Sequence, residues 1–150
     1  MAPAPQAPPA DETDPLANLL ARIAHRVNRQ IETILNRSGL TLEQWRVLDL
    51  LSDRQGRPMS EIAAAVMVPP PTLTKIVDRL VDNALVHRRV DEADRRRVVV
   101  LTSERGLELH GELAPAVTRV DQDLIAALGE QESRQLIELL RRLTAGQVVD

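Results

Sequence analysis

Residues 60–102 constrain the fold of this chain most, because three local patterns follow one another there without a gap. The run SEIAAAVM, residues 60–67, has the pattern of a short helix capped by its serine and ended by the Val-Pro pair that follows. A second helix, which starts with prolines, is expected from about residue 70 or 71 to residue 83. Two β-rich runs, residues 86–90 and 97–101, then flank a polar, turn-prone tip. This order of helix, turn, helix and hairpin predicts a winged helix-turn-helix.

The segment before this unit has the pattern of two helices. Residues 14–38 repeat leucine, isoleucine and valine at helical spacing, and Asp14 followed by Pro15 is typical of a capped helix start. Thr41 and Gln44 form a capping box for the next helix, TLEQWRVLDLLSD. The buried face of that helix is expected to hold Trp45, Leu48, Leu51 and part of Val47.

The segment after the hairpin predicts two further helices. Ser103 is expected to cap the first, whose apolar period continues past Pro115 until Gly129 breaks it. Residues 130–143 form the second. Long apolar stripes outside a compact winged unit need a partner, and a homodimer built from both chain ends is the simplest one.

We therefore expect a mainly α fold of six helices with a two-stranded β-wing, dimerised through its N- and C-terminal helices. The predicted divisions are a disordered Pro/Ala-rich tail (1–13), an N-terminal dimerisation helix (14–38), the winged helix-turn-helix domain (39–102) and the C-terminal dimerisation helices (103–150).

Composition excludes several classes of protein. The chain has no cysteine, which rules out disulfides, thiolate metal sites and a cysteine redox sensor. It has no nucleophile-elbow, phosphate-loop or dinucleotide-binding motif, so we expect neither an enzyme nor a cofactor. No apolar run approaches the roughly 18 residues that cross a bilayer, and the N-terminus lacks signal-peptide features. A cytoplasmic protein is expected.

The distribution of charge points to duplex DNA as a partner. Net charge is −3, yet residues 88–97 carry five arginines against three acidic residues. A hairpin tip of this size fits a minor groove, where the negative potential favours arginine. The alternative is that these charged residues form a solvated surface run and bind no partner.

The helix that starts with the prolines is expected to act as the recognition helix, with its first residues in the major groove. Its apolar positions, Leu73, Ile76, Val77 and Leu80, are spaced to face the core. The prolines remove amide donors for phosphate and offer rings suited to thymine methyl groups. The structural alternative for Thr72 and Thr74 is helix capping, and for Arg79 it is an ion pair with Asp78 or Asp82.

We expect DNA contacts from the exposed start of this helix and from the wing tip. Asp94 is expected to order the tip by accepting hydrogen bonds from Arg96 or from tip amides. The full set of expected DNA contacts is Pro70, Pro71, Thr72, Thr74, Lys75, Arg79, Arg95, Arg96 and Arg97.

With these motifs in place, the sequence resembles the MarR family of winged-helix regulators over about residues 16–143. The matching pieces are LTLEQWRVLDLL, SEIAAAV, TLTKIVDRLVDNALVHR and DEADRRRVVVLTSERG. The resemblance implies a homodimer that binds a palindromic operator, usually represses transcription and often releases DNA when a small ligand binds. It also implies wing roles for Asp94 and Arg96. The chain has one residue fewer than usual before the wing's Leu-Thr pair, which leaves open whether Arg95, Arg96 or Arg97 enters the groove.

Family ligands, often aromatic acids, bind between the DNA module and the dimerising helices. The residues that this chain offers there are Arg22, His25, Arg26, Trp45 and Arg46, although Trp45 fits a core position better than a ligand site. Neither His25 nor His110 has metal-ligand spacing, so no metal site is expected. The alternative function is a winged-helix protein-interaction module without specific DNA binding, but such a module has no need of an arginine-loaded tip.

Overall fold

A computed structural model of the chain describes residues 14–146. The expected tail, residues 1–13, and the last four residues of the C-terminal segment lie outside the described residues. The elements in chain order are α1 (Leu16–Leu35), the 3₁₀ turn η1 (Asn36–Ser38), α2 (Leu42–Leu50), β1 (Arg57–Pro58), α3 (Met59–Val66), α4 (Pro70–Asp82), β2 (Val86–Val90), β3 (Val98–Thr102), α5 (Glu104–Leu128) and α6 (Glu130–Ala145).

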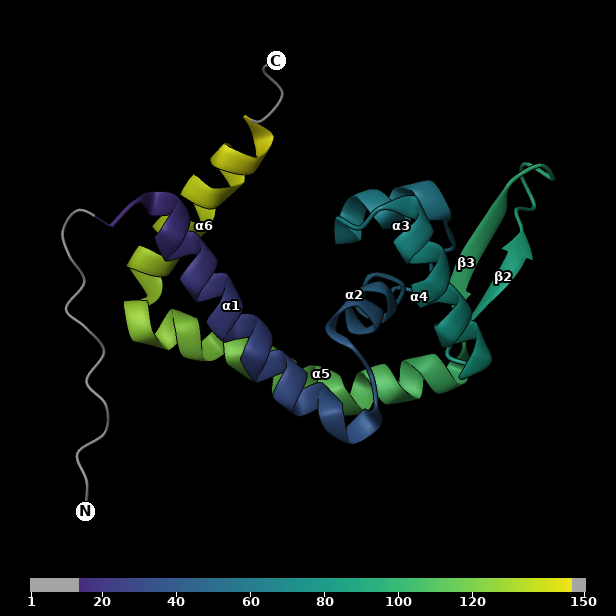
Figure 1. The fold of residues 1–150 in the computed structure, drawn as a ribbon, viewed down its shortest axis with the longest axis horizontal. Helices are drawn as coiled ribbons and strands as arrows, with labels where there is room; N and C mark the ends of the chain where they lie inside the picture. Colours follow the sequence, from purple (N-terminus) through teal and green to yellow (C-terminus); the bar gives the residue numbers. More distant parts are fainter. Residues whose placement is uncertain (1–13, 147–150) are drawn as a thin grey trace.

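These elements form two lobes joined by α5. In Figure 1, α2, α3, α4 and the strands make the lobe on the right, and α5 runs beneath it toward the left. There α1 and α6 lie against the far end of α5. The predicted six helices and mainly α fold are confirmed, and the helix that passes Pro115 continues without interruption to Leu128.

An aliphatic core holds the winged lobe together. The predicted inward face of α2 is confirmed, because Trp45 is 4% exposed and Val47, Leu48 and Leu51 are fully buried. The predicted inward face of α4 is confirmed as well, and Ile62 and Val66 of α3 belong to the same core as the buried residues of α2 and α4. Among the described residues, no buried side-chain nitrogen or oxygen lacks a hydrogen-bond partner. The helix-turn-helix is therefore a closely packed unit that presents α4 on its surface.

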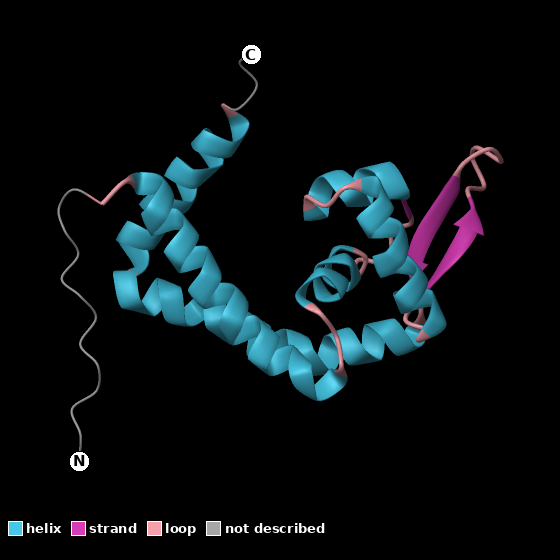
Figure 2. Ribbon diagram, viewed as in Figure 1, coloured by secondary structure: helices cyan, strands magenta, loops and turns pink. Residues whose placement is uncertain are grey.

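The sheet has three strands, in the order β1-β3-β2, so the prediction of a two-stranded wing was incomplete. Figure 2 shows the two long strands at the outer edge of the winged lobe. The third strand, β1, has only two residues, which pair with Val99 and Val100 of β3. Strands β2 and β3 have five residues each and pair antiparallel from Val86↔Thr102 to Val90↔Val98. This registered pairing extends the hairpin away from the core.

Two predicted helix caps are confirmed and two are wrong. In α2, the Gln44 amide donates to Thr41 Oγ1 at 3.2 Å, and the Thr41 amide donates to Gln44 Oε1 at 3.0 Å. Ser103 also caps α5. Asp14 does not cap α1, because it forms an ion pair with Arg22 and Pro15 takes the capping position.

The predicted Ser60 cap is wrong because α3 begins earlier than expected. It starts at Met59, directly after β1, so Ser60 lies inside the first turn and Pro58 takes the capping position without a side-chain hydrogen bond.

The start of α5 is fixed against the turn between α4 and β2. Ser103 Oγ accepts from the Gly106 amide at 2.9 Å and donates to the Ala84 carbonyl at 2.6 Å. The Ser103 amide donates to the Leu85 carbonyl at 3.0 Å. This network connects the end of the wing to the long helix through Gly106.

An ion pair orders the turn that leads from α2 into β1. The Arg57 guanidinium donates to both carboxylate oxygens of Asp53, at 2.8 and 2.5 Å, and to the Leu50 carbonyl at 3.0 Å. The hydrogen bonds from Arg57 to the carboxylate, followed by one from the Gln55 amide, lower the pKa of Asp53 to about 2. The pair fixes the point at which β1 joins the sheet.

Over residues 14–146, no helix combines the length and the apolar character that crossing a membrane requires.

Candidate DNA interface

Helix α4 presents one exposed side that starts with proline rings. Leu73, Val77 and Leu80 are fully buried, which turns the opposite side of the helix to solvent. On that side Pro71, Lys75 and Asp78 are exposed and spaced i, i+4, i+7, so they form one row along the helix. The structure thus places Lys75 on an open face, next to the exposed threonines of the first two turns.

The remaining predicted residues of α4 are exposed as well. These are Pro70, Thr72, Thr74 and Arg79. The Thr74 hydroxyl donates to the Pro70 carbonyl at 3.1 Å, which uses its proton within the helix. Helix α4 has Pro69 as its N-cap and no side-chain cap hydrogen bond, so Thr72 does not cap it.

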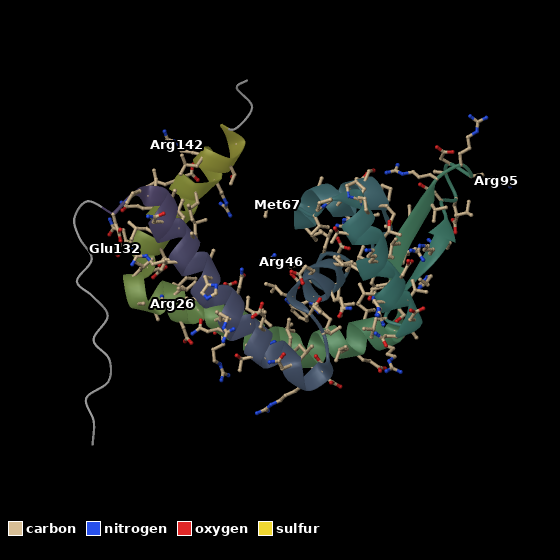
Figure 3. All side chains as sticks on the ribbon, in the orientation of Figure 1. Arg26, Arg46, Met67, Arg95, Glu132 and Arg142 are labelled. Atoms are coloured by element: carbon tan, nitrogen blue, oxygen red, sulfur yellow. The ribbon has the colours of Figure 1, made fainter. Side chains whose placement is uncertain are left out.

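Asp94 orders the wing tip. Its carboxylate accepts from the Arg96 amide at 3.0 Å, and its carbonyl accepts from the Arg97 amide at 2.9 Å. The Asp91 amide donates to the Arg97 carbonyl at 2.8 Å and closes the end of the hairpin. Figure 3 shows Arg95 at this end, away from the body of the lobe. The tip is a closed turn that carries adjacent arginines.

Ion pairs divide the wing arginines into two groups. Arg97 donates to Glu61 of α3 at 2.6 Å, and Arg88 of β2 donates to Asp78 of α4 at 2.6 Å. Both bonds bind the hairpin to the helix-turn-helix. Within the described part of the chain, Arg89 of β2 makes no ion pair, and neither do Arg95 and Arg96 at the tip. Those two arginines therefore keep their positive charge available at the tip.

The same ion pairs change the electrostatics of the exposed face. Asp78 lies in the row with Lys75 and would repel a phosphate backbone if it stood alone. Pairing with Arg88 offsets that charge, as pairing with Arg97 offsets the charge of Glu61. Among residues 14–146, Lys75 and Arg79 make no ion pair. The face of α4 and the wing thus has a positive surplus despite the acidic chain.

The residues proposed for a ligand are not gathered into one site. Trp45 lies in the core, and its ring stacks on His110 of α5 with centroids 5.0 Å apart and planes 5° apart. Arg46 donates to Asn28 Oδ1 of α1 at 3.1 Å, while Arg22 pairs with Asp14. His25 and Arg26 are exposed on α1, and Figure 3 labels Arg26 and Arg46 on separate helices.

The contact between Trp45 and His110 was missed by sequence reasoning, which treated His110 as unremarkable. His110 Nε2 also lies 2.7 Å from Asp49 Oδ1 of α2, so one imidazole connects two side chains of α2 to α5. No local pattern joins residues so far apart in sequence. In residues 14–146, no group of three histidine or acidic side chains is arranged to hold a metal ion.

Known proteins share this architecture. The sequence model of the MarR family matches residues 38–97. The transcriptional regulator FarR of Neisseria gonorrhoeae is 30% identical over 114 residues, which cover 76% of this chain and 78% of FarR.

Two solved structures match over nearly all of their length. The MepR–DNA complex of S. aureus superposes with a TM-score of 0.80 at 25% identity and covers 88% of this chain and 98% of MepR. NadR in complex with 4-hydroxyphenylacetate superposes with a TM-score of 0.77 at 26% identity and covers 91% of this chain and 97% of NadR.

These relatives agree with the expectation of a regulator rather than an enzyme. The family match falls on α2, α3, α4 and most of the wing, which are the elements that build the exposed face described above. The chain therefore belongs to the MarR family of transcriptional regulators.

Proposed function

We propose that this chain is a homodimeric, sequence-specific DNA-binding regulator that represses transcription from a palindromic operator. The observation that carries the proposal is the Asp78–Arg88 ion pair, which holds the base of the wing beside the exposed row of α4. Helix and hairpin then reach the duplex from one face of the lobe. The start of α4 enters the major groove, and the wing tip enters the adjacent minor groove.

Within this proposal the wing arginines have different tasks. Arg95 and Arg96 contact the minor groove, because the turn closed by Asp94 presents both at the tip. Arg97 contacts DNA only by exchanging Glu61 for a phosphate, so its main task is to brace the wing against α3. Lys75 and Arg79 supply the cationic contacts of α4, with Arg79 directed at a phosphate.

A second copy of the chain covers the apolar surface of the other lobe. An open pocket of about 430 Å³ between α1 and α6 is lined mainly by leucines. Large apolar side chains of α1, α5 and α6 are 40–62% exposed in the single chain: Leu16, Leu19, Leu20, Ile23, Ile125, Leu128, Leu136, Ile137, Leu139 and Leu143. So many large apolar side chains left exposed on three helices are typical of a protein interface. A two-fold dimer would place two α4 helices about one DNA turn apart.

Release of DNA by a small effector completes the proposal. NadR is described with 4-hydroxyphenylacetate bound, an aromatic acid. In this chain Arg46 of α2, whose guanidinium reaches Asn28 of α1, is the cationic group that such a carboxylate would meet between the two helices. Arg46 would have to exchange its hydrogen bond with Asn28 for the ligand.

The test is the salt dependence of duplex binding. Full-length protein is titrated into a fluorescent duplex, obtained by selection from a random pool, at several salt concentrations. Each phosphate contact contributes about −0.9 to the slope of log K against log [salt]. Arg95→Ala should flatten the slope, whereas Arg54→Ala should not, because Arg54 belongs to neither α4 nor the wing tip and pairs with Glu104 at the start of α5. Failure to bind any duplex would instead favour the protein-interaction module.

A further inference from the structure

The start of α4 lacks the amides with which helices bind phosphate. The N-cap and the first three residues of a helix carry N–H groups without a partner inside the helix. Here those positions are Pro69, Pro70, Pro71 and Thr72, so only Thr72 has an N–H to offer. The first turn also holds no acidic residue. Backbone capture of a phosphate, the usual chemistry of a helix N-terminus, is reduced to one donor at most.

Apolar surface takes the place of those amides. A rotation of about 100° per residue puts the Pro71 ring on the side opposite the buried Leu73 and Val77. Thr74 follows on the neighbouring exposed position of the next turn. Because its hydroxyl donates to the Pro70 carbonyl at 3.1 Å, what it has left to offer is a methyl group and the lone pairs of its oxygen.

One group on a base edge of the major groove matches such a surface. The four bases present hydrogen-bond donors and acceptors there, and the C5 methyl group of thymine is the only apolar feature among them. A proline ring also makes an apolar contact without losing rotamer entropy, since it has no freely rotating side chain. Rigid pyrrolidine rings at the leading end of a recognition helix are therefore suited to methyl groups rather than to phosphates.

We propose that Pro71, with Pro70 and Thr74, selects operator half-sites by contact with thymine methyl groups. This inference rests on the proposed function and adds the chemical identity of the bases read by the first turn of α4. Lys75, one turn beyond Pro71 in the same row, supplies the polar contact beside the thymines.

Replacement of thymine by deoxyuridine isolates the methyl group. Deoxyuridine keeps the base pairing and every hydrogen-bonding group of thymine, so the exchange removes one methyl and little else. The probe is the duplex that the full-length protein selects from a random pool, resynthesised with one deoxyuridine at a time. We expect one or two positions per half-site to lose affinity by a factor of about four each, the value of one buried methyl-sized group.

Protein variants then show which residue meets the methyl. Pro71→Ala should bring the ratio of affinities for the thymine and deoxyuridine duplexes close to one at its position. Thr74→Ser, which removes only a methyl from the protein, should do the same at the neighbouring position. Lys75→Ala is the control: it should weaken both duplexes and leave their ratio unchanged.

The outcomes separate the inference from the function on which it rests. Tight, sequence-specific binding that is indifferent to deoxyuridine at every position overturns methyl recognition and leaves the DNA-binding regulator intact. A ratio that Pro71→Ala and Thr74→Ser do not change overturns the assignment to the first turn of α4. Selection of no duplex overturns the proposed function, and methyl recognition with it.

Discussion

Two glycines of α5 predict opposite responses to the same substitution. A Cβ atom built on Gly106 would lie 2.1 Å from the Leu85 carbonyl oxygen and 2.6 Å from Thr102 Oγ1. A Cβ atom on Gly111 would meet nothing within 4 Å. Both residues lie inside the helix, so alanine brings the same gain in helix propensity at each, about 1 kcal/mol at most.

The cost at Gly106 follows from what surrounds it. The Leu85 carbonyl accepts the Ser103 amide at 3.0 Å, so it cannot move away from a new methyl group without loss of that hydrogen bond. Forcing an extra methyl into a packed site costs about 1–3 kcal/mol, and a lost hydrogen bond about 0.5–1.5 kcal/mol more. After the propensity gain, Gly106→Ala should destabilise the protein by roughly 1–3 kcal/mol. Gly111→Ala should stabilise it by about 0.5–1 kcal/mol.

Urea unfolding followed by circular dichroism measures the difference. All proteins must be compared at one protomer concentration, because the stability of a dimer depends on concentration. We expect the unfolding midpoint of Gly106→Ala to fall and that of Gly111→Ala to rise, with similar m-values. Equal midpoints for the two variants would refute the packing described for the junction between wing and α5.

Three further substitutions test other parts of the account. Lys75→Ala should weaken operator binding, measured by fluorescence anisotropy, by about 1–3 kcal/mol if the ammonium contacts a base. Wild-type affinity of this variant would contradict the placement of α4 in the major groove. Asp53→Asn removes the pair with Arg57. Because the folded pKa of Asp53 is lowered to about 2, that pair stabilises above the ordinary carboxyl pKa, and the benefit is lost as the pH falls toward 2. The Tm difference between wild type and this variant should therefore be constant above about pH 5 and shrink below about pH 4; a difference independent of pH would count against the pair. Leu139→Glu changes a residue of α6 that is 53% exposed and should halve the mass measured by light scattering. The control Met67→Glu changes a residue of the other lobe that is 85% exposed and should leave a dimer. A dimer in both cases would mean that α6 does not form the interface.

Local sequence signals predicted most of the fold because they act over a few residues. The Thr41–Gln44 capping box and the inward face of α4 depend on spacings of three or four residues, which any chain shows directly. Strand β1 was not predicted because a strand of two residues is too short to show an alternating pattern. The Asp14 cap failed because Arg22, two helical turns away, takes the carboxylate.

The candidate interface was predictable in composition but not in detail. The arginine-rich tip is visible in the sequence, yet the assignment of Arg97 to Glu61 spans 36 residues and depends on how the hairpin lies over α3. The Trp45–His110 stack likewise requires α5 to pass beneath α2. Tertiary contacts of this kind have no periodic signature, so the sequence could identify the residues involved but not which residue each of them contacts.

Dimethyl sulfate footprinting tests the central claim, that the start of α4 and the wing tip occupy neighbouring grooves of one duplex. The reagent methylates guanine N7 in the major groove and adenine N3 in the minor groove, so a single experiment reports on both. At saturating protein, we predict protection of guanine N7 and adenine N3 in each half-site. The double variant Arg95→Ala/Arg96→Ala should lose the protection of adenine N3 and keep the protection of guanine N7. Unchanged minor-groove protection in that variant would contradict the account.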